Sequence, residues 1–206
     1  MKHFLIIFTL LIFTISGCNK HEVKIIEQND KIVAVGDSLT FGFGGGGTTY
    51  PEELAKIIKR QVVNEGVSGH TSAQVLERID NIIQKEKPAY VLLAIGGNDM
   101  LRRVNDEDIK KNIINIIEKL EHSGVKVILI AEPRPRSNGL IFGISDADLY
   151  KEIAKKKGIL LIGDAFTKFL NNEKYKSDFI HLNAQGYIKA AEKIAEELKS
   201  NKLIVD

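Results

Sequence analysis

Short apolar runs alternate with longer amphipathic segments along most of this chain. Five runs rich in Val, Ile and Leu predict buried strands, at residues 31–35, 61–64, 89–95, 125–131 and 159–162. Segments with apolar residues at helical spacing predict helices at residues 51–60, 71–85, 106–122, 145–157 and 183–199. Because short strands alternate with longer helices, the pattern predicts an α/β domain with a parallel sheet covered by helices on both faces.

The first 30 residues have a different character. Lys2 and His3 precede a hydrophobic run, residues 4–15, whose length is typical of a signal peptide rather than of a membrane span. Small residues then lead to Cys18, in a pattern that resembles the lipobox of bacterial lipoproteins. A plain secretory signal with an incidental cysteine, or an uncut anchor, is the alternative interpretation.

The lipobox resemblance implies three parts of the chain. Residues 1–17 are a cleaved signal peptide, residues 18–30 a lipidated Cys18 followed by a polar tether, and residues 31–206 the folded domain. The acyl chains on Cys18 would hold the protein on a bacterial membrane after export across the cytoplasmic membrane, on the periplasmic or cell-surface side.

Composition excludes several classes of function. The 29 Lys and Arg residues nearly balance the 27 Asp and Glu residues, and the formal net charge is +2. A nucleic-acid-binding protein usually carries a concentrated basic excess, so we expect no nucleic-acid partner. With one cysteine, the chain has neither an intrachain disulfide nor a cysteine-rich zinc site.

Polar motifs follow the predicted strands and precede the last helix. Gly-Asp-Ser-Leu stands at residues 36–39, a glycine-containing stretch at residues 64–69, Gly-Gly-Asn-Asp at residues 96–99 and Asp-Phe-Ile-His at residues 178–181. Ligands bind beyond the carboxyl ends of strands in such folds. Each motif alone has an ordinary structural explanation as a helix cap or turn.

Some residues of these motifs could also carry chemistry. Ser38 stands at the carboxyl edge of the predicted sheet, and the Asn98 amide is a neutral donor able to hold an oxyanion. A carboxylate, Asp178, lies three residues before His181, where it can fix the imidazole tautomer.

Together, the four motifs resemble those of the SGNH (GDSL-type) hydrolase superfamily, in its thioesterase, lysophospholipase and arylesterase-like branch. The resemblance runs from about residue 31 to the end of the chain. It implies a three-layer, doubly wound, flavodoxin-like fold. It also implies a Ser38–His181–Asp178 triad and an oxyanion hole formed by Ser38 N–H, Gly69 N–H and the Asn98 amide. The substrate would be a small acyl ester, thioester or lysolipid, with no metal and no cofactor.

Several alternatives stay open at this stage. Gly66 competes with Gly69 as an oxyanion donor, and His70 is a rival base without an obvious orienting carboxylate. Asp37 and Asp99 are expected to hold loops together rather than act on substrate.

In the loop after the fourth strand, Arg134 and Arg136 would face either an anionic head group or solvent. Two other functions are compatible with the fold. One is deacetylation of acetylated glycans, and the other is binding without catalysis.

Overall fold

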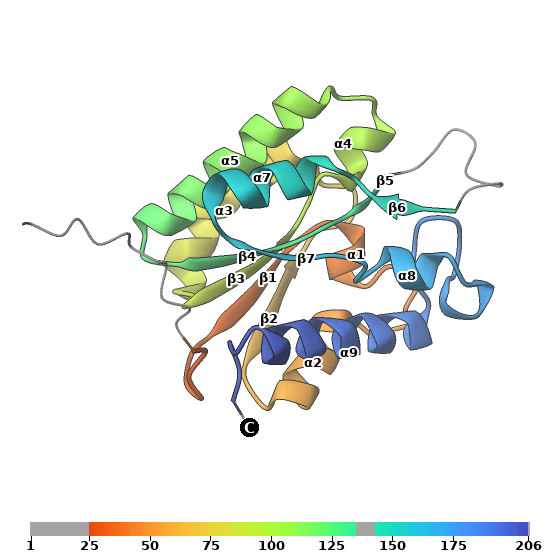
Figure 1. Cartoon of the computed structure of the whole chain (residues 1–206), viewed down its shortest axis with the longest axis horizontal. Coiled ribbons are helices and arrows are strands. Elements are labelled where there is room, and N and C mark those ends of the chain that lie inside the picture. Colours follow the sequence, from red (N-terminus) through yellow and green to blue (C-terminus); the bar gives the residue numbers. More distant parts are fainter. Residues whose placement is uncertain (1–24, 135–142, 206) are drawn as a thin grey trace, which may run out of the picture.

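A five-stranded parallel sheet forms the centre of the computed structural model, which describes residues 25–134 and 143–205. The strand order is β2-β1-β3-β4-β7 (Figure 1). The strands are β1 (Ile32–Gly36), β2 (Val62–Gly66), β3 (Tyr90–Ala94), β4 (Lys126–Ile130) and β7 (Leu160–Ile162). The predicted α/β class and all five predicted strands are confirmed.

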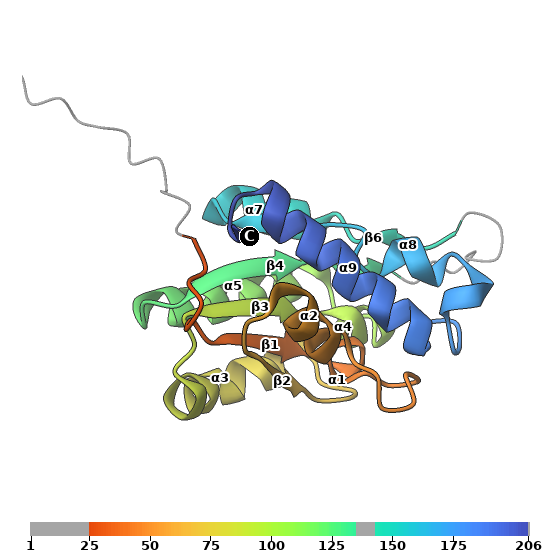
Figure 2. The same ribbon diagram turned by 90° about the horizontal axis from the view of Figure 1, so that it is seen from below.

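Helices cover both faces of the sheet, as Figure 2 shows. On one face lie α2 (Tyr50–Ile58), α8 (Thr167–Leu170) and α9 (Ala184–Ser200); on the other lie α3 (Ser72–Glu86), α5 (Asp106–His122) and α7 (Leu149–Lys157). Alternate residues of each strand face opposite layers, so Ile32 and Ala34 of β1 pack with the first set while Val33 and Val35 pack with the second. This two-sided burial explains why the strands are continuously apolar.

Local signals in the sequence set the ends of the long helices. Thr71 forms a capping box with Gln74 at the start of α3, and the Asn183 side chain accepts the Gly186 N–H at the start of α9. Gly158 ends α7 in the left-handed conformation, at φ 64°.

The helix predicted at residues 145–157 is wrong in its first turn, because it begins at Leu149. Residues Ser145–Asp146 form instead a short strand, β6, which pairs with β5 (Pro133–Arg134). The Asp146 carboxylate accepts hydrogen bonds from the Asp164 N–H and the Thr167 hydroxyl, each at 2.8 Å. These contacts hold Asp146 in extended backbone.

Four short helical elements near the carboxyl ends of the strands were not predicted. They are α1 (Ser38–Phe41), which follows β1, α4 (Gly97–Leu101), which follows β3, α8 (Thr167–Leu170), which follows β7, and a 3₁₀ turn at Glu173–Tyr175. With three to five residues each, they are too short for a hydrophobic period to appear in the sequence.

The segment before β1 packs on the domain from Ile26 onward. The Ile26 side chain is fully buried, its N–H donates to Leu203 O at 2.7 Å, and its carbonyl accepts from Arg60 Nε at 3.1 Å. The last part of the predicted tether therefore belongs to the folded domain. The predicted signal peptide and Cys18 lie outside the described residues. No helix in the described ranges is long and apolar enough to cross a membrane.

Truncation of Ile26 should destabilise the domain, because the removed atoms leave a cavity in a packed cluster. We expect Ile26→Ala to lower the free energy of unfolding by about 2–5 kcal/mol. The adjacent Ile25 is 40% exposed and serves as the control, since Ile25→Ala removes the same atoms from a solvated position. Urea denaturation of both variants measures the difference, and equal midpoints would show that Ile26 does not pack as described.

Candidate active site

Ser38 is presented by a tight turn at the carboxyl end of β1. Asp37 caps α1 and accepts the Leu39 N–H at 3.0 Å, which starts a helical turn directly at the serine. The preceding residue, Gly36, must be glycine, because a Cβ there would lie 2.3 Å from Ala94 O of β3. The turn therefore places Ser38 at the carboxyl edge of the sheet, where the residue is buried and lines a cavity.

A chain of two hydrogen bonds joins Ser38 to His181 and Asp178. Ser38 Oγ lies 3.0 Å from His181 Nε2, and His181 Nδ1 lies 2.8 Å from Asp178 Oδ2. The other carboxylate oxygen, Asp178 Oδ1, accepts the backbone N–H groups of Ile180 and His181 at 2.9 and 2.8 Å. The ring of Phe43 lies 4.5 Å from the imidazole, centre to centre. The structure thus brings together Ser38, Asp178 and His181, although Ser38 and His181 are 143 positions apart in the sequence.

The surroundings of Asp178 keep it ionised. Partial burial raises its pKa, but the hydrogen bonds from the His181 ring and from the Ile180 and His181 N–H groups outweigh burial, so the pKa lies below its usual value. Because the ionised carboxylate accepts a hydrogen bond from Nδ1–H, Nε2 is left as the acceptor that faces the Ser38 hydroxyl. The same carboxylate can stabilise the imidazolium that would form if Nε2 took up a proton.

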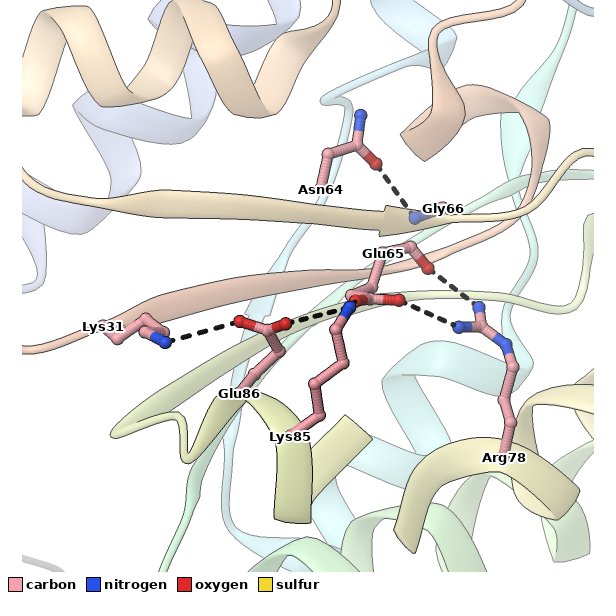
Figure 3. A network of polar contacts seen from close by, with 7 residues as sticks. All are labelled: Lys31, Asn64, Glu65, Gly66, Arg78, Lys85 and Glu86. Atoms are coloured by element: carbon pink, nitrogen blue, oxygen red, sulfur yellow. Dashed lines mark hydrogen bonds and ion pairs between the residues drawn. The ribbon is translucent and has the colours of Figure 1, made fainter. Parts of the chain in front are cut away.

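Ser38 and Gly69 line one cavity, and their backbone N–H groups are the candidate oxyanion donors. Within residues 25–134 and 143–205, neither the Ser38 N–H nor the Gly69 N–H has a hydrogen-bond partner. Gly69 has φ +81°, and no atom lies within 4 Å of the position of a Cβ there. The rival donor, the Gly66 N–H, is bonded to Asn64 Oδ1 at 2.9 Å (Figure 3). This geometry favours Gly69 over Gly66 as an oxyanion donor.

The Asn98 amide lies at the same place but is already engaged. Its Nδ2 donates to Asp37 Oδ2 at 2.9 Å and to His70 O at 3.1 Å. One of these bonds has to be exchanged before the amide can donate to a ligand.

A cavity of about 190 Å³ adjoins these groups. Its walls are partly polar and partly apolar, and the apolar side chains include Phe43, Leu101 and Ile180.

A network of charged side chains holds the ends of β1 and β2 against α3 (Figure 3). Arg78 of α3 donates to the carbonyls of Glu65 and Gly36 at 2.8 and 3.4 Å. Glu65 also pairs with Lys85, which continues through Glu86 to Lys31 in a line of ion pairs. Arg78 thereby fixes the two carbonyls from which the loops bearing Ser38 and Gly69 depart.

Two other predicted residues support loops. The Asp99 carboxylate accepts the Ser72 N–H at 2.8 Å and its hydroxyl at 2.6 Å, which ties α4 to α3. His70 contributes its carbonyl to Asn98, and burial lowers the pKa of its ring, as does the nearby Arg78. His70 Nδ1 is buried without a partner in the described part of the chain, and no carboxylate orients the ring toward Ser38.

One of the two arginines after β4 is part of an ion pair. Arg134 Nη2 lies 2.6 Å from Asp106 Oδ2 of α5. Arg136 lies outside the described residues. The described ranges also contain no cluster of three or more metal-ligating side chains.

Sequence reasoning missed Glu132, which lines the cavity directly after β4. Its side chain is 1% exposed, and Oε2 accepts the Gly97 N–H at 2.8 Å. The available signal was an acidic residue at the end of a continuous apolar strand, where a solvated carboxylate is not expected.

The chain is similar to a family of known hydrolases. The GDSL-like Lipase/Acylhydrolase family model matches residues 34–188. Esterase TesA of Pseudomonas aeruginosa is 30% identical over 139 residues, which are 64% of this chain and 68% of that protein. Thioesterase 1/protease 1/lysophospholipase L1 of Escherichia coli K12 is 25% identical over 174 residues, or 82% of this chain and 84% of that protein.

A solved structure extends the agreement to three dimensions. The crystal structure of TesA matches with a TM-score of 0.72 at 25% identity, and the match covers 82% of this chain and 98% of that one. The span matched by the family model contains Ser38, Gly69, Asn98, Asp178 and His181. The chain therefore belongs to the GDSL-like lipase/acylhydrolase family.

Proposed function

We propose that this protein is a serine acyl-ester hydrolase in which Ser38 is the nucleophile, His181 the general base and Asp178 the residue that orients His181. The observation that carries the proposal is the unbroken chain from Ser38 Oγ to His181 Nε2 at 3.0 Å and from His181 Nδ1 to Asp178 Oδ2 at 2.8 Å. A nucleophile bonded to a base that a third group orients is the arrangement that nucleophilic catalysis requires.

The reaction proceeds in two halves. Ser38 Oγ attacks the acyl carbonyl while His181 Nε2 takes the hydroxyl proton, and the imidazolium then gives that proton to the departing alcohol or thiol. Water next attacks the acyl-enzyme with His181 again as base, which releases the carboxylic acid and restores the Ser38 hydroxyl.

Both tetrahedral intermediates carry a negative oxygen, which needs preorganised donors. The Ser38 and Gly69 N–H groups are available without rearrangement. Asn98 becomes the third donor by giving up its 3.1 Å bond to the neutral His70 carbonyl, because its shorter bond to the Asp37 carboxylate is charge-assisted.

The apolar part of the cavity favours a substrate with an apolar acyl or aryl group over an acetylated glycan. Phe43 and Leu101 line the cavity and are 48% and 46% exposed, so an alkyl or aryl substituent would bury apolar surface there. The relatives named as an esterase and as a thioesterase and lysophospholipase support the same substrate class.

Replacement of the nucleophile should abolish turnover. We expect the wild-type protein to hydrolyse p-nitrophenyl esters of short to medium acyl chains and Ser38→Ala to lose the activity, since no other group can form the acyl-enzyme. Ser123→Ala is the matched control, because Ser123 lies exposed after α5 at the opposite end of the sheet. No turnover by folded wild-type protein with any acyl chain would instead support a binding function.

Loss of the Asn98 amide should slow the chemical step. We expect Asn98→Ala to reduce kcat by about 10²–10³ with little change in KM, as removal of one oxyanion donor does elsewhere. Steady-state kinetics with a p-nitrophenyl ester measure both constants. A rise in KM alone, with kcat unchanged, would show that Asn98 binds substrate without stabilising the transition state.

We also propose that the mature chain is anchored through a lipidated Cys18. The lipobox-like sequence around the one cysteine supports this localisation. The chain enters β1 at its amino end, and Ser38 follows its carboxyl end. The strand spans roughly 17 Å at ~3.3 Å per residue. An enzyme tethered in this way would direct its active site away from the anchoring membrane.

Removal of the thiol tests the anchor. Cys18→Ser should release the protein from membranes into the soluble fraction and leave the specific activity of the domain unchanged, because Cys18 is distant in sequence from the site. Fractionation followed by an esterase assay measures both properties. Retention of the variant on membranes would rule out lipidation as the means of attachment.

A further inference from the structure

Two buried carboxyl groups meet behind Asn98. Asp37, at the end of β1, is 2% exposed, and Glu132, at the end of β4, is 1% exposed. Glu132 Oε2 and Asp37 Oδ2 lie 2.3 and 3.4 Å from the position that a Cβ on Gly97 would take, so the two carboxyl groups are neighbours. Two ionised carboxylates side by side in a buried site would repel each other, so one of the two groups holds a proton.

The hydrogen-bond partners indicate which group is protonated. Asp37 accepts the Leu39 N–H through Oδ1 and the Asn98 amide through Oδ2, so two donors stabilise its charge. Glu132 Oε2 accepts the Gly97 N–H. Within the described residues Glu132 Oε1 is buried without a hydrogen-bond partner, so no donor stabilises a negative charge on that oxygen.

Burial acts in the same direction. Burial and the nearby charge of Asp37 hold the pKa of Glu132 well above its usual range. Burial raises the pKa of Asp37 to about 6, while the hydrogen bonds from Leu39, Glu132 and Asn98 oppose that rise. At neutral pH these directions leave Asp37 ionised and Glu132 neutral.

The groups facing the pair disfavour a second negative charge. Asp99 of α4 adds to the negative potential at Glu132, and the positive form of His181 favours ionisation of Asp37. The guanidinium of Arg134 is paired with Asp106. In the described part of the chain, buried phenols also face the pair, and burial raises the pKa of each: Tyr50 of α2, Tyr150 of α7 and Tyr187 of α9.

We propose that Glu132 is a positioning residue that, as a neutral carboxylic acid, donates to Asp37 and accepts from Gly97 N–H, and so fixes the Asn98 amide beside the oxyanion cavity. The inference rests on the proposed esterase function. In this arrangement Asp37 is the ionised acceptor of the Asn98 amide, and Glu132 accepts the N–H of the adjacent Gly97. The turn that carries Asn98 is therefore held at both residues. Asn98 can then exchange its contact with His70 for the substrate oxygen without losing its orientation.

Three variants test the positioning role. Glu132→Leu keeps the approximate side-chain volume but removes the O–H donor to Asp37 and the acceptor of Gly97 N–H. We expect kcat to fall roughly 10- to 100-fold with KM nearly unchanged. This loss should not exceed the loss caused by Asn98→Ala. Glu132→Gln retains an N–H donor for Asp37 and an oxygen for Gly97, so it should restore most of that loss. In the Asn98→Ala background, Glu132→Leu should cost less than about threefold more, because coupled residues are not additive.

Two kinetic results would overturn the proposal. If Glu132→Gln is impaired as much as Glu132→Leu, the site needs an ionised glutamate rather than a neutral acid. If the effects of Glu132→Leu and Asn98→Ala multiply, Glu132 does not act through Asn98.

A measurement on the unliganded protein is independent of turnover. The infrared difference spectrum of wild type minus Glu132→Gln at neutral pH should contain the carbonyl stretch of a protonated carboxylic acid. Glu152→Gln is the control, since the Glu152 side chain is 61% exposed and its variant should leave that band in place. Absence of the band overturns the proposal even if the protein is an esterase. If the band is present, Glu132 is a neutral acid even if the esterase assays fail. The band also tests the protonation of Glu132 if Glu132→Leu does not fold.

Discussion

The hydrogen bond between Ser38 and His181 depends on two loops from distant parts of the chain meeting at one edge of the sheet. Ser38 is fixed by the end of β1, whereas His181 belongs to a loop just before α9. That loop is braced by its own contacts: Ser177 N–H donates to His181 O at 2.9 Å, and Asn183 Nδ2 donates to Lys174 O at 2.8 Å. Because these bonds fix the loop backbone, the imidazole reaches the serine without a rearrangement, which is the preorganisation that acyl transfer needs.

Around this contact the fold buries three acids, at a cost in desolvation that their partners offset. Each acid also joins two elements: Asp99 links α4 to α3, Asp37 links the start of α1 to Asn98, and Glu132 links the end of β4 to Gly97. Asn98 and Gly97 are thus held from three directions. The site obtains its donor geometry from buried carboxyl groups that never need to touch substrate.

Much of the architecture followed from the sequence, because long strands and helices bury apolar residues at regular spacing. Helix 106–122 was predicted with the bounds it has in the structure. The short helices α1 and α4 were missed because they are held by side-chain contacts rather than by an apolar face. The positions of Ser38, Asn98 and His181 came from the family motifs, whereas the partners of Glu132 and Asn98 depend on neighbours distant in sequence, which no local pattern reveals.

The most direct test is a crystal structure of the protein with Ser38 covalently modified by an alkyl phosphonate, since the phosphoryl oxygen occupies the place of the oxyanion. The account predicts that this oxygen lies about 3 Å from the Ser38 N, the Gly69 N and Asn98 Nδ2. It also predicts that Asn98 keeps its bond to Asp37 and loses the one to His70. A phosphoryl oxygen turned away from Gly69 and Asn98, or an adduct on another residue, would contradict it.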